Sequence, residues 1–314
     1  MSKKITINII KAIVGILLFY YIVIQIEFTT LSVILKDIDF APAILGLLCM
    51  GASGIVGSQR WRILMEAQGL NFNYFTTLKW TFIGMFYNTF MPGLTGGDII
   101  KAVYVTKKTS NKTSAVMTVF VDRVTGILGL ALVGAIAITV CNIKSSEFIQ
   151  AKILLYLFLL LAVLIGCVFF SKRIRRFIYF DFIIGKLPFS GIVNDADEAI
   201  LCYRRHKATV FKAIVLSVCI HVTVIFGVYL FGLALGVSTL GYSYLGVLAL
   251  IPAVFILSSF AITPAGIGVG ESLSIYLLAS IGTTTEQALS IMLLFRISQI
   301  IWSLLGGLAI IRQR

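Results

Sequence analysis

Residues 91–98 read MPGLTGGD, and they interrupt an apolar stretch that otherwise runs from Tyr74 to Thr106. Proline ends a helix and glycine lets another backbone come close, so this sequence predicts two short helices instead of one long helix. The arm after the break has about 12 residues before Lys107. At ~1.5 Å per residue it covers ~18 Å, which is too short for a hydrocarbon core of ~30 Å. We therefore expect segment 74–106 to enter the membrane from the cytoplasm, turn within it and return.

A second apolar stretch, residues 244–282, is broken in the same way. Its break at residues 263–271 reads TPAGIGVGE. The break has no lysine or arginine, in contrast to the expected cytoplasmic loops, so we expect this segment to enter and return on the outer side. Each break holds a proline, then glycines, then a carboxylate.

The two breaks occupy matching places in the chain. Pro92 precedes Arg123 by 31 residues, and Pro264 precedes Arg296 by 32. Because the two hairpins are expected on opposite faces, this spacing predicts an inverted repeat of the kind found in secondary transporters. The expected halves are 40–141, with hairpin 74–106, and 208–311, with hairpin 244–282. The alternative is a chance likeness between two membrane segments rich in glycine and proline.

The composition of the whole chain sets its class. Of 314 residues, 59% are hydrophobic and 12% are charged, and the mean hydropathy is +1.02. Soluble domains have about a quarter charged residues, so a soluble enzyme, a disordered chain and a secreted disulfide scaffold are excluded. We expect an all-α polytopic membrane protein, one transmembrane domain over residues 1–314, with about six full spans. The apolar runs that give these spans lie near 7–26, 41–57, 113–141, 153–170, 208–236 and 288–311.

The formal net charge of +13 follows the expected topology. Basic residues lie mostly between the apolar runs, and the predicted outer loops hold only Lys36, Lys144 and Lys152. This asymmetry predicts that both termini lie in the cytoplasm. It favours anionic lipid, and not nucleic acid, as the partner of the basic residues.

Two features are expected at the cytoplasmic edge. Residues 172–207 form the largest cytoplasmic loop, with an interfacial helix whose apolar stripe includes Ala199 and Tyr203. Arg60 and Arg62 follow the second span, and we interpret them as interfacial anchors.

Charges within the spans are the candidate site residues. Arg123 and Arg296 lie about ten and eight residues into their spans, and a guanidinium fits phosphate oxygens well. Asp98, Asp122 and Glu271 are candidates for ion pairing with these arginines or for proton coupling. Structural ion pairs without a ligand are the alternative, as is simple helix capping by Asp98 and Glu271.

Other candidates lie at the breaks. The positive ends of the second half-helices favour an anionic group, so Gly96, Gly97, Gly266 and Gly268 are candidate substrate-binding positions. Lys101 follows Asp98 by one turn and joins this set. The chain has no HExxH, GxSxG or Walker A pattern, so we expect no enzyme, no cofactor and no metal site.

These motifs together resemble the flippase-like transmembrane domain of the lysylphosphatidylglycerol synthases, whose standalone members are called the UPF0104 or YbhN-like family. The residues that carry the resemblance are Arg60-Trp61-Arg62, Pro92 through Asp98 to Lys101, Asp122-Arg123 with Gly126, and Pro264 through Glu271. The resemblance covers nearly the whole chain. Two positions depart from the family pattern: Lys101 stands where an arginine is common, and Ala265 where a glycine is common.

The resemblance implies movement of a polar-headed lipid across a prokaryotic cytoplasmic (inner) membrane. Two-part members of the family add a soluble synthase domain, which we expect to be absent because the sequence stops at Arg314. We expect a phosphate-bearing lipid as substrate, such as aminoacyl-phosphatidylglycerol or a polyprenyl-phosphate lipid, and a lipid-modifying or glycosyl-transferring enzyme as a partner. The alternatives are a small-solute or ion-coupled transporter, a membrane-embedded lipid enzyme, and a scaffold that does not transport.

Overall fold

The computed structural model describes residues 38–89, 96–141, 145–170, 199, 201–238, 241–260 and 268–312. In these ranges every regular element is helical. Five helices are long and apolar enough to cross a membrane: α3 (Phe40–Ala67), α6 (Lys112–Val140), α7 (Ser146–Phe170), α11 (Lys207–Ala234) and α14 (Thr285–Ile311). The shorter elements are α4 (Tyr74–Asn88), α5 (Gly96–Thr106), α12 (Tyr244–Ser259), α13 (Val269–Leu278) and the 3-10 turn η1 (Ala279–Ile281). The protein is thus an all-α, multi-pass membrane protein, and the expected first span, 7–26, lies outside the described residues.

Helix α3 is longer than the span predicted for it. The apolar run ends near residue 57, but the helix continues to Ala67. Trp61, Leu64 and Met65 in the extra turns are fully buried. Packing against neighbouring helices, and not the length of the apolar run, therefore sets the end of this helix.

Helices α4 and α5 run antiparallel on either side of the first predicted break. Next to the break, the backbone N–H of Gly97 donates to Oδ1 of Asn88 at 2.6 Å. Farther from it, the rings of Trp80 and Tyr104 lie with their centroids 6.2 Å apart. The break itself, residues 90–95, lies outside the described residues.

Helices α12 and α13 form a second antiparallel pair. Near the break, a Cβ on Gly270 would lie 3.2 Å from Oγ of Ser258. At the other end, a Cβ on Gly246 would lie 3.4 Å from Cγ2 of Ile281. Both apolar stretches are therefore divided into two helices where the sequence predicted a break.

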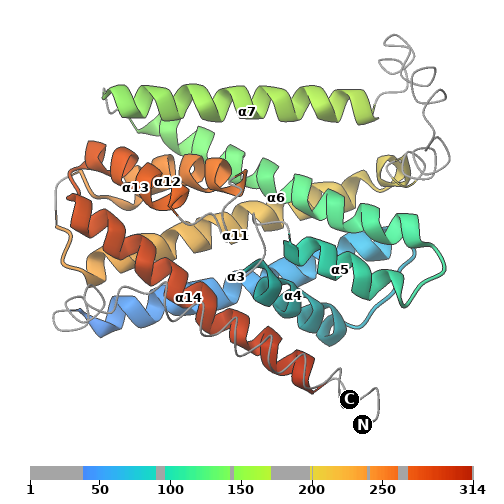
Figure 1. Cartoon of the computed structure of the whole chain (residues 1–314). Coiled ribbons are helices and arrows are strands. Elements are labelled where there is room, and N and C mark those ends of the chain that lie inside the picture. The colour runs from blue at the N-terminus through green and yellow to red at the C-terminus, as the bar shows by residue number, and fades with distance from the viewer. Residues whose placement is uncertain are drawn as a thin grey trace.

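Each short pair packs against the long helix that follows the other pair. Helix α4 contacts α14, and α12 contacts α6. Glycines allow both contacts: Gly306 of α14 lies directly against the backbone of Phe82, and a Cβ on Gly134 of α6 would lie 2.7 Å from Cβ of Pro252. Figure 1 shows the two short pairs toward opposite ends of the molecule, with α3 and α11 between them.

Part of the segment before α11 packs onto the end of α3. Ala199 and Tyr203, both in the predicted apolar stripe, are buried. The hydroxyl of Tyr203 donates to the carbonyl of Leu64 at 3.0 Å. Residues 171–198 of the predicted cytoplasmic loop lie outside the described residues.

Candidate functional site

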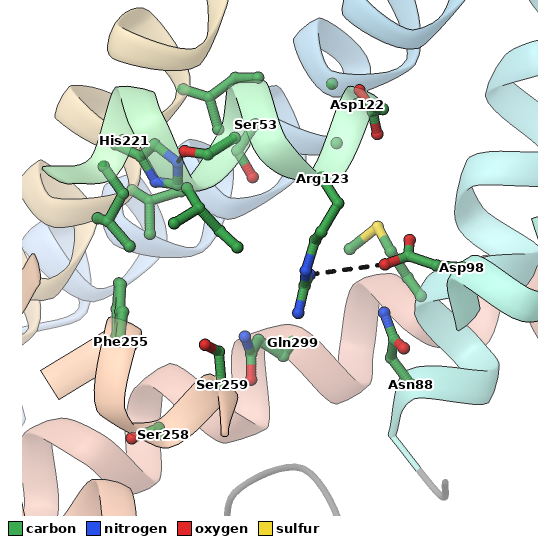
Figure 2. Close-up of a pocket in the computed structure, with 18 of the residues that line it drawn as sticks. Ser53, Asn88, Asp98, Asp122, Arg123, His221, Phe255, Ser258, Ser259 and Gln299 are labelled. Carbon is green, nitrogen blue, oxygen red and sulfur yellow. Dashed lines mark hydrogen bonds and ion pairs between the residues drawn. The ribbon is translucent and has the colours of Figure 1, made fainter. Parts of the chain in front are cut away.

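A single cavity collects most of the charges predicted within the spans. Its volume is about 340 Å³, and residues from both short helix pairs and from α3, α6, α11 and α14 line it. The charged side chains among its described lining residues are Arg60, Asp98, Lys101, Asp122, Arg123 and Arg296. In Figure 2, Asn88 and Asp98 face this cavity from one side and Phe255, Ser258 and Ser259 from the other.

Arg60 lies inside the protein, which corrects its interpretation as an interfacial anchor. Its Nε donates to Oδ1 of Asp122 at 2.7 Å, and one of its terminal nitrogens donates to Oγ of Ser217 at 2.9 Å. The side chains of Arg60 and Asp122 are only 12% and 5% exposed. The extra turns of α3 carry Arg60 into contact with α6 and α11, so a buried ion pair holds these three helices together.

Lys101 bridges two carboxylates. Its Nζ lies 3.8 Å from Oδ1 of Asp98 and 3.6 Å from Oδ2 of Asp122. The same nitrogen lies 5.0 Å from the centre of the Trp61 ring, within the range of a cation–π contact. A lysine can serve several acceptors as a compact point charge, whereas arginine would offer a planar fork at this position.

The pair formed by Arg123 and Asp98 is loose. One terminal nitrogen of Arg123 lies 3.7 Å from Oδ2 of Asp98, beyond hydrogen-bond distance. This carboxylate oxygen is buried and has no hydrogen-bond partner. The Arg123 side chain is 32% exposed, and Figure 2 shows it reaching into the middle of the cavity. Arg123 is therefore placed to receive an acceptor, and Asp98 to receive a donor.

Glu271 and Arg296 form the corresponding pair on α13 and α14, and it is tight. Nε of Arg296 donates directly to Oε1 of Glu271. The other carboxylate oxygen of Glu271 accepts the backbone N–H of Gly268 at 2.7 Å. Capping and ion pairing, which the sequence left as alternatives, therefore coexist at Glu271.

The two ion pairs occupy matching positions in the sequence, although one is loose and the other tight. In each pair the arginine follows the carboxylate by 25 residues. The shift along the chain that takes Asp98 to Glu271 and Arg123 to Arg296 also takes Gly97 to Gly270.

The described candidate glycines, Gly96, Gly97 and Gly268, do not line the cavity. Gly97 packs directly on the carbonyl of Gly84, and Gly96 is also buried. Gly268 starts α13 with a φ of +86°, a conformation that favours glycine. Gly270 lines the cavity instead, and Gly266 lies outside the described residues.

Sequence reasoning missed the neutral polar lining of the cavity. Ser53, Gly57 and Arg60 lie at spacings of four and three residues on α3, so they share one helix face. That spacing was a readable signal for Arg60. The remaining neutral polar lining residues are Thr81, Asn88, His221, Ser258, Ser259 and Gln299. Among these, Nε2 of His221 lies 2.9 Å from the carbonyl oxygen of Gly126, which gives this partly buried histidine a structural partner.

The arrangement suits anion binding. Four cationic side chains from α3, α5, α6 and α14 line the cavity. In the described part of the chain, no group of three or more histidine, cysteine or acidic side chains gathers as a metal site would require.

Comparison of the sequence with known proteins gives two matches. The family model of the lysylphosphatidylglycerol synthase TM region matches residues 8–307. A UPF0104 membrane protein of Pyrococcus horikoshii is 26% identical over 311 residues, which cover 92% of this chain and 91% of that protein. The chain therefore belongs to the family of the lysylphosphatidylglycerol synthase transmembrane region.

Proposed function

We propose that this protein translocates a phosphate-bearing lipid, such as aminoacyl-phosphatidylglycerol or a polyprenyl-phosphate lipid, across the cytoplasmic membrane. The observation that carries the proposal is the cavity lined by two arginines from long apolar helices. Arg123 comes from α6 and Arg296 from α14. Ionisable groups at such depth are costly and usually mark a substrate path. Membership of the family supports a role connected with membrane lipids.

In the proposed topology, six full spans surround two re-entrant hairpins of opposite orientation. The α4–α5 pair enters from the cytoplasm and the α12–α13 pair from outside, and both termini are cytoplasmic. Residues 40–141 and 208–311 are then the two halves of an inverted repeat. The crossed contacts of α4 with α14 and of α12 with α6 support this arrangement, because a two-fold relation predicts that such contacts occur in pairs.

The proposed mechanism is alternating access around the cavity. Arg123 attracts the lipid phosphate, while the carboxylates hold the other cations in place. The two halves then rock against each other, the Glu271–Arg296 ion pair opens, and Arg296 takes over the phosphate on the other side. The lipid tails stay in the bilayer. No covalent chemistry is part of this mechanism, and a partner enzyme would make or consume the lipid.

A translocation assay in proteoliposomes tests the proposal. Lipids labelled on a tail with a fluorophore are reconstituted with the protein, and a membrane-impermeant reductant quenches the outer leaflet. Wild type is compared with Arg123→Ala and Arg296→Ala. Each change removes a charge-assisted contact worth ~1.5–3 kcal/mol, so translocation is expected to slow by about tenfold or more.

The matched control is Lys108→Ala, which removes an exposed cation at the end of α5. It is expected to leave the rate at the wild-type level. Absence of translocation of every lipid by well-folded wild type, in the presence and absence of a proton gradient, would contradict the lipid function and favour the solute transporter. Equal effects of the three substitutions would contradict the role of the two arginines.

A further inference from the structure

The charges that line the cavity indicate which lipid headgroup it can bind, in more detail than membership of the family does. The described lining contains four cations and two carboxylates, Asp98 and Asp122. A third carboxylate, Glu271, is not part of the lining but forms an ion pair with Arg296. With His221 counted as uncharged, as in the formal net charge, the described lining is left with one positive charge. The hairpin breaks, residues 90–95 and 261–267, contain no charged residue.

The excess charge can be located. Arg60 is hydrogen-bonded to Asp122, and Arg296 to Glu271. Lys101 lies between Asp98 and Asp122. Only the Arg123 pair among these is both loose and partly open to the cavity. An unbalanced charge in a low-dielectric site is costly, so a ligand with one net negative charge on Arg123 gives the best balance.

A second observation concerns hydrogen bonds, and it is independent of the charge count. Oδ2 of Asp98 is buried without a hydrogen-bond partner, 3.7 Å from the Arg123 guanidinium. Leaving a buried charged acceptor without a hydrogen bond is costly. The ligand must therefore carry a donor within a few bonds of its phosphate. Oγ atoms of Thr81 and Ser258, also without partners, offer further contacts from the lining.

We propose that the cavity takes a hydroxylated phosphodiester headgroup of net charge −1, the chemistry of a phosphoglycerol. The phosphate binds Arg123 and a neighbouring hydroxyl donates to Asp98. This assignment rests on the lipid function proposed above, and within the class of phosphate-bearing lipids it selects phosphatidylglycerol over the examples named there. A polyprenyl phosphate has no hydroxyl donor and carries nearly two charges, and lysyl-phosphatidylglycerol has a net positive headgroup that leaves the excess charge unbalanced.

The size of the cavity agrees with a single headgroup. Its volume of about 340 Å³ lies at the low end of the ~300–1,000 Å³ typical of small-molecule sites. A phosphoglycerol headgroup has about ten non-hydrogen atoms and fits such a space, whereas a lipid-linked oligosaccharide is far larger.

Lipid binding to the purified full-length protein tests this assignment without relying on transport. Native mass spectrometry at pH 8 measures competition among phosphatidylglycerol, phosphatidylethanolamine, lysyl-phosphatidylglycerol and undecaprenyl phosphate. Wild type is expected to prefer phosphatidylglycerol by about tenfold, the effect of 1.4 kcal/mol. Equal binding of all four lipids, or preference for any of the other three, would overturn the assignment.

Substitutions sharpen the test by changing the charge of the cavity. Asp98→Asn raises the cavity charge by one and replaces one carboxylate oxygen with an amide donor, so preference is expected to move about tenfold toward undecaprenyl phosphate. Arg123→Gln lowers the charge by one and is expected to abolish the preference for phosphatidylglycerol over phosphatidylethanolamine. The matched control is Glu66→Gln, which has the same charge change as Asp98→Asn but lies outside the cavity lining. If Asp98→Asn and Glu66→Gln shift the preference equally, the assignment is wrong.

Failure of this assignment and failure of the lipid function give different results. A protein that translocates lipids without preferring phosphatidylglycerol keeps the function and loses the headgroup assignment. Soluble glycerophosphoglycerol is added as a competitor, because it carries the same phosphodiester as the lipid headgroup but has no tails. If it displaces phosphatidylglycerol at equal concentration, the phosphodiester is a solute, which contradicts the lipid function and retains the headgroup chemistry.

Discussion

A carboxylate that is 5% exposed within a membrane helix, as Asp122 is, requires a cation beside it. Desolvating the charge costs several kcal/mol, and only close pairing with good hydrogen bonds offsets this cost. Arg60 supplies that pairing and is itself held by Ser217. The pair connects α3, α6 and α11, so its role in stability is separable from the binding role proposed for Arg123.

Removal of Arg60 alone is therefore expected to be severe. Arg60→Gln leaves Asp122 charged and poorly paired, at a cost of ~3–5 kcal/mol. The double variant Arg60→Gln/Asp122→Asn leaves no such charge and is expected to recover part of the loss. Thermal unfolding in detergent measures both.

The matched control at this scale is Arg62→Gln. Arg62 pairs with Glu66, but both side chains are about one-third exposed, and such pairs contribute ~0–1 kcal/mol. An Arg62→Gln variant as unstable as Arg60→Gln would contradict the argument from burial, as would a double variant no more stable than Arg60→Gln.

The sequence indicated the partners of some charged residues and not of others, and the difference has a physical reason. Pairing of Glu271 with Arg296 was one of the alternatives that the sequence offered, because both are charges in apolar segments, and the structure pairs them. Arg60 was misread because an Arg-Trp-Arg sequence after an apolar run is typical of an interface. Only the packing of the last turns of α3 shows that this arginine points inward.

At the level of elements, glycine sets how closely the arms of the first helix pair approach. Gly97 of α5 lies directly on the carbonyl of Gly84 in α4, and its own N–H is held by Asn88. A methyl group at Gly97 has no space unless the two helices separate. Asp98, one residue along, would then move relative to Arg123.

Gly97→Ala is expected to lower stability by about 1–3 kcal/mol, the usual cost of overpacking. Gly57→Ala in α3 is the matched control, because its Cβ would meet only Cδ1 of Ile220, at 3.9 Å. Replacing a helical glycine that has free space stabilises by ~0.5–1 kcal/mol. The unfolding temperatures of the two variants should therefore shift in opposite directions, and shifts of the same sign would contradict the packing of α4 on α5.

Element boundaries were predictable where a local signal sets them. Proline and glycine act within a few residues, so the breaks after Asn88 and Ser259 could be placed from sequence. The end of α3 could not, because Trp61 and Leu64 extend the helix through contacts with distant segments. The first span and the tips of the two breaks lie outside the described residues, so their predictions stay as predictions.

For the whole molecule, the proposed two-fold relation predicts that the two short helix pairs have opposite orientations in the membrane. If the halves are inverted, the ends of the α4–α5 pair face the cytoplasm and the ends of the α12–α13 pair face outside. The structure supplies the paired contacts, and the membrane orientation follows from the distribution of basic residues. Cysteine accessibility measures that orientation directly.

Single cysteines in a variant that lacks the five native cysteines provide the test. Asn71→Cys and Lys108→Cys flank the first pair, Ser243→Cys and Thr285→Cys flank the second, and all four side chains are exposed. A membrane-impermeant maleimide applied to intact cells or spheroplasts is expected to label Ser243→Cys and Thr285→Cys. The other two are expected to react only after the membrane is permeabilised.

Labelling of all four positions from the same side would contradict the inverted repeat, since both pairs would then have one orientation. It would also contradict alternating access. In that mechanism Arg123 and Arg296, the arginines of the matched pairs Asp98–Arg123 and Glu271–Arg296, hold the phosphate in turn on opposite sides of the membrane. The anion-binding cavity would remain, because the contacts that define it do not depend on orientation. This measurement therefore separates the transport mechanism from the binding site, and a site without inversion would favour lipid binding by a scaffold.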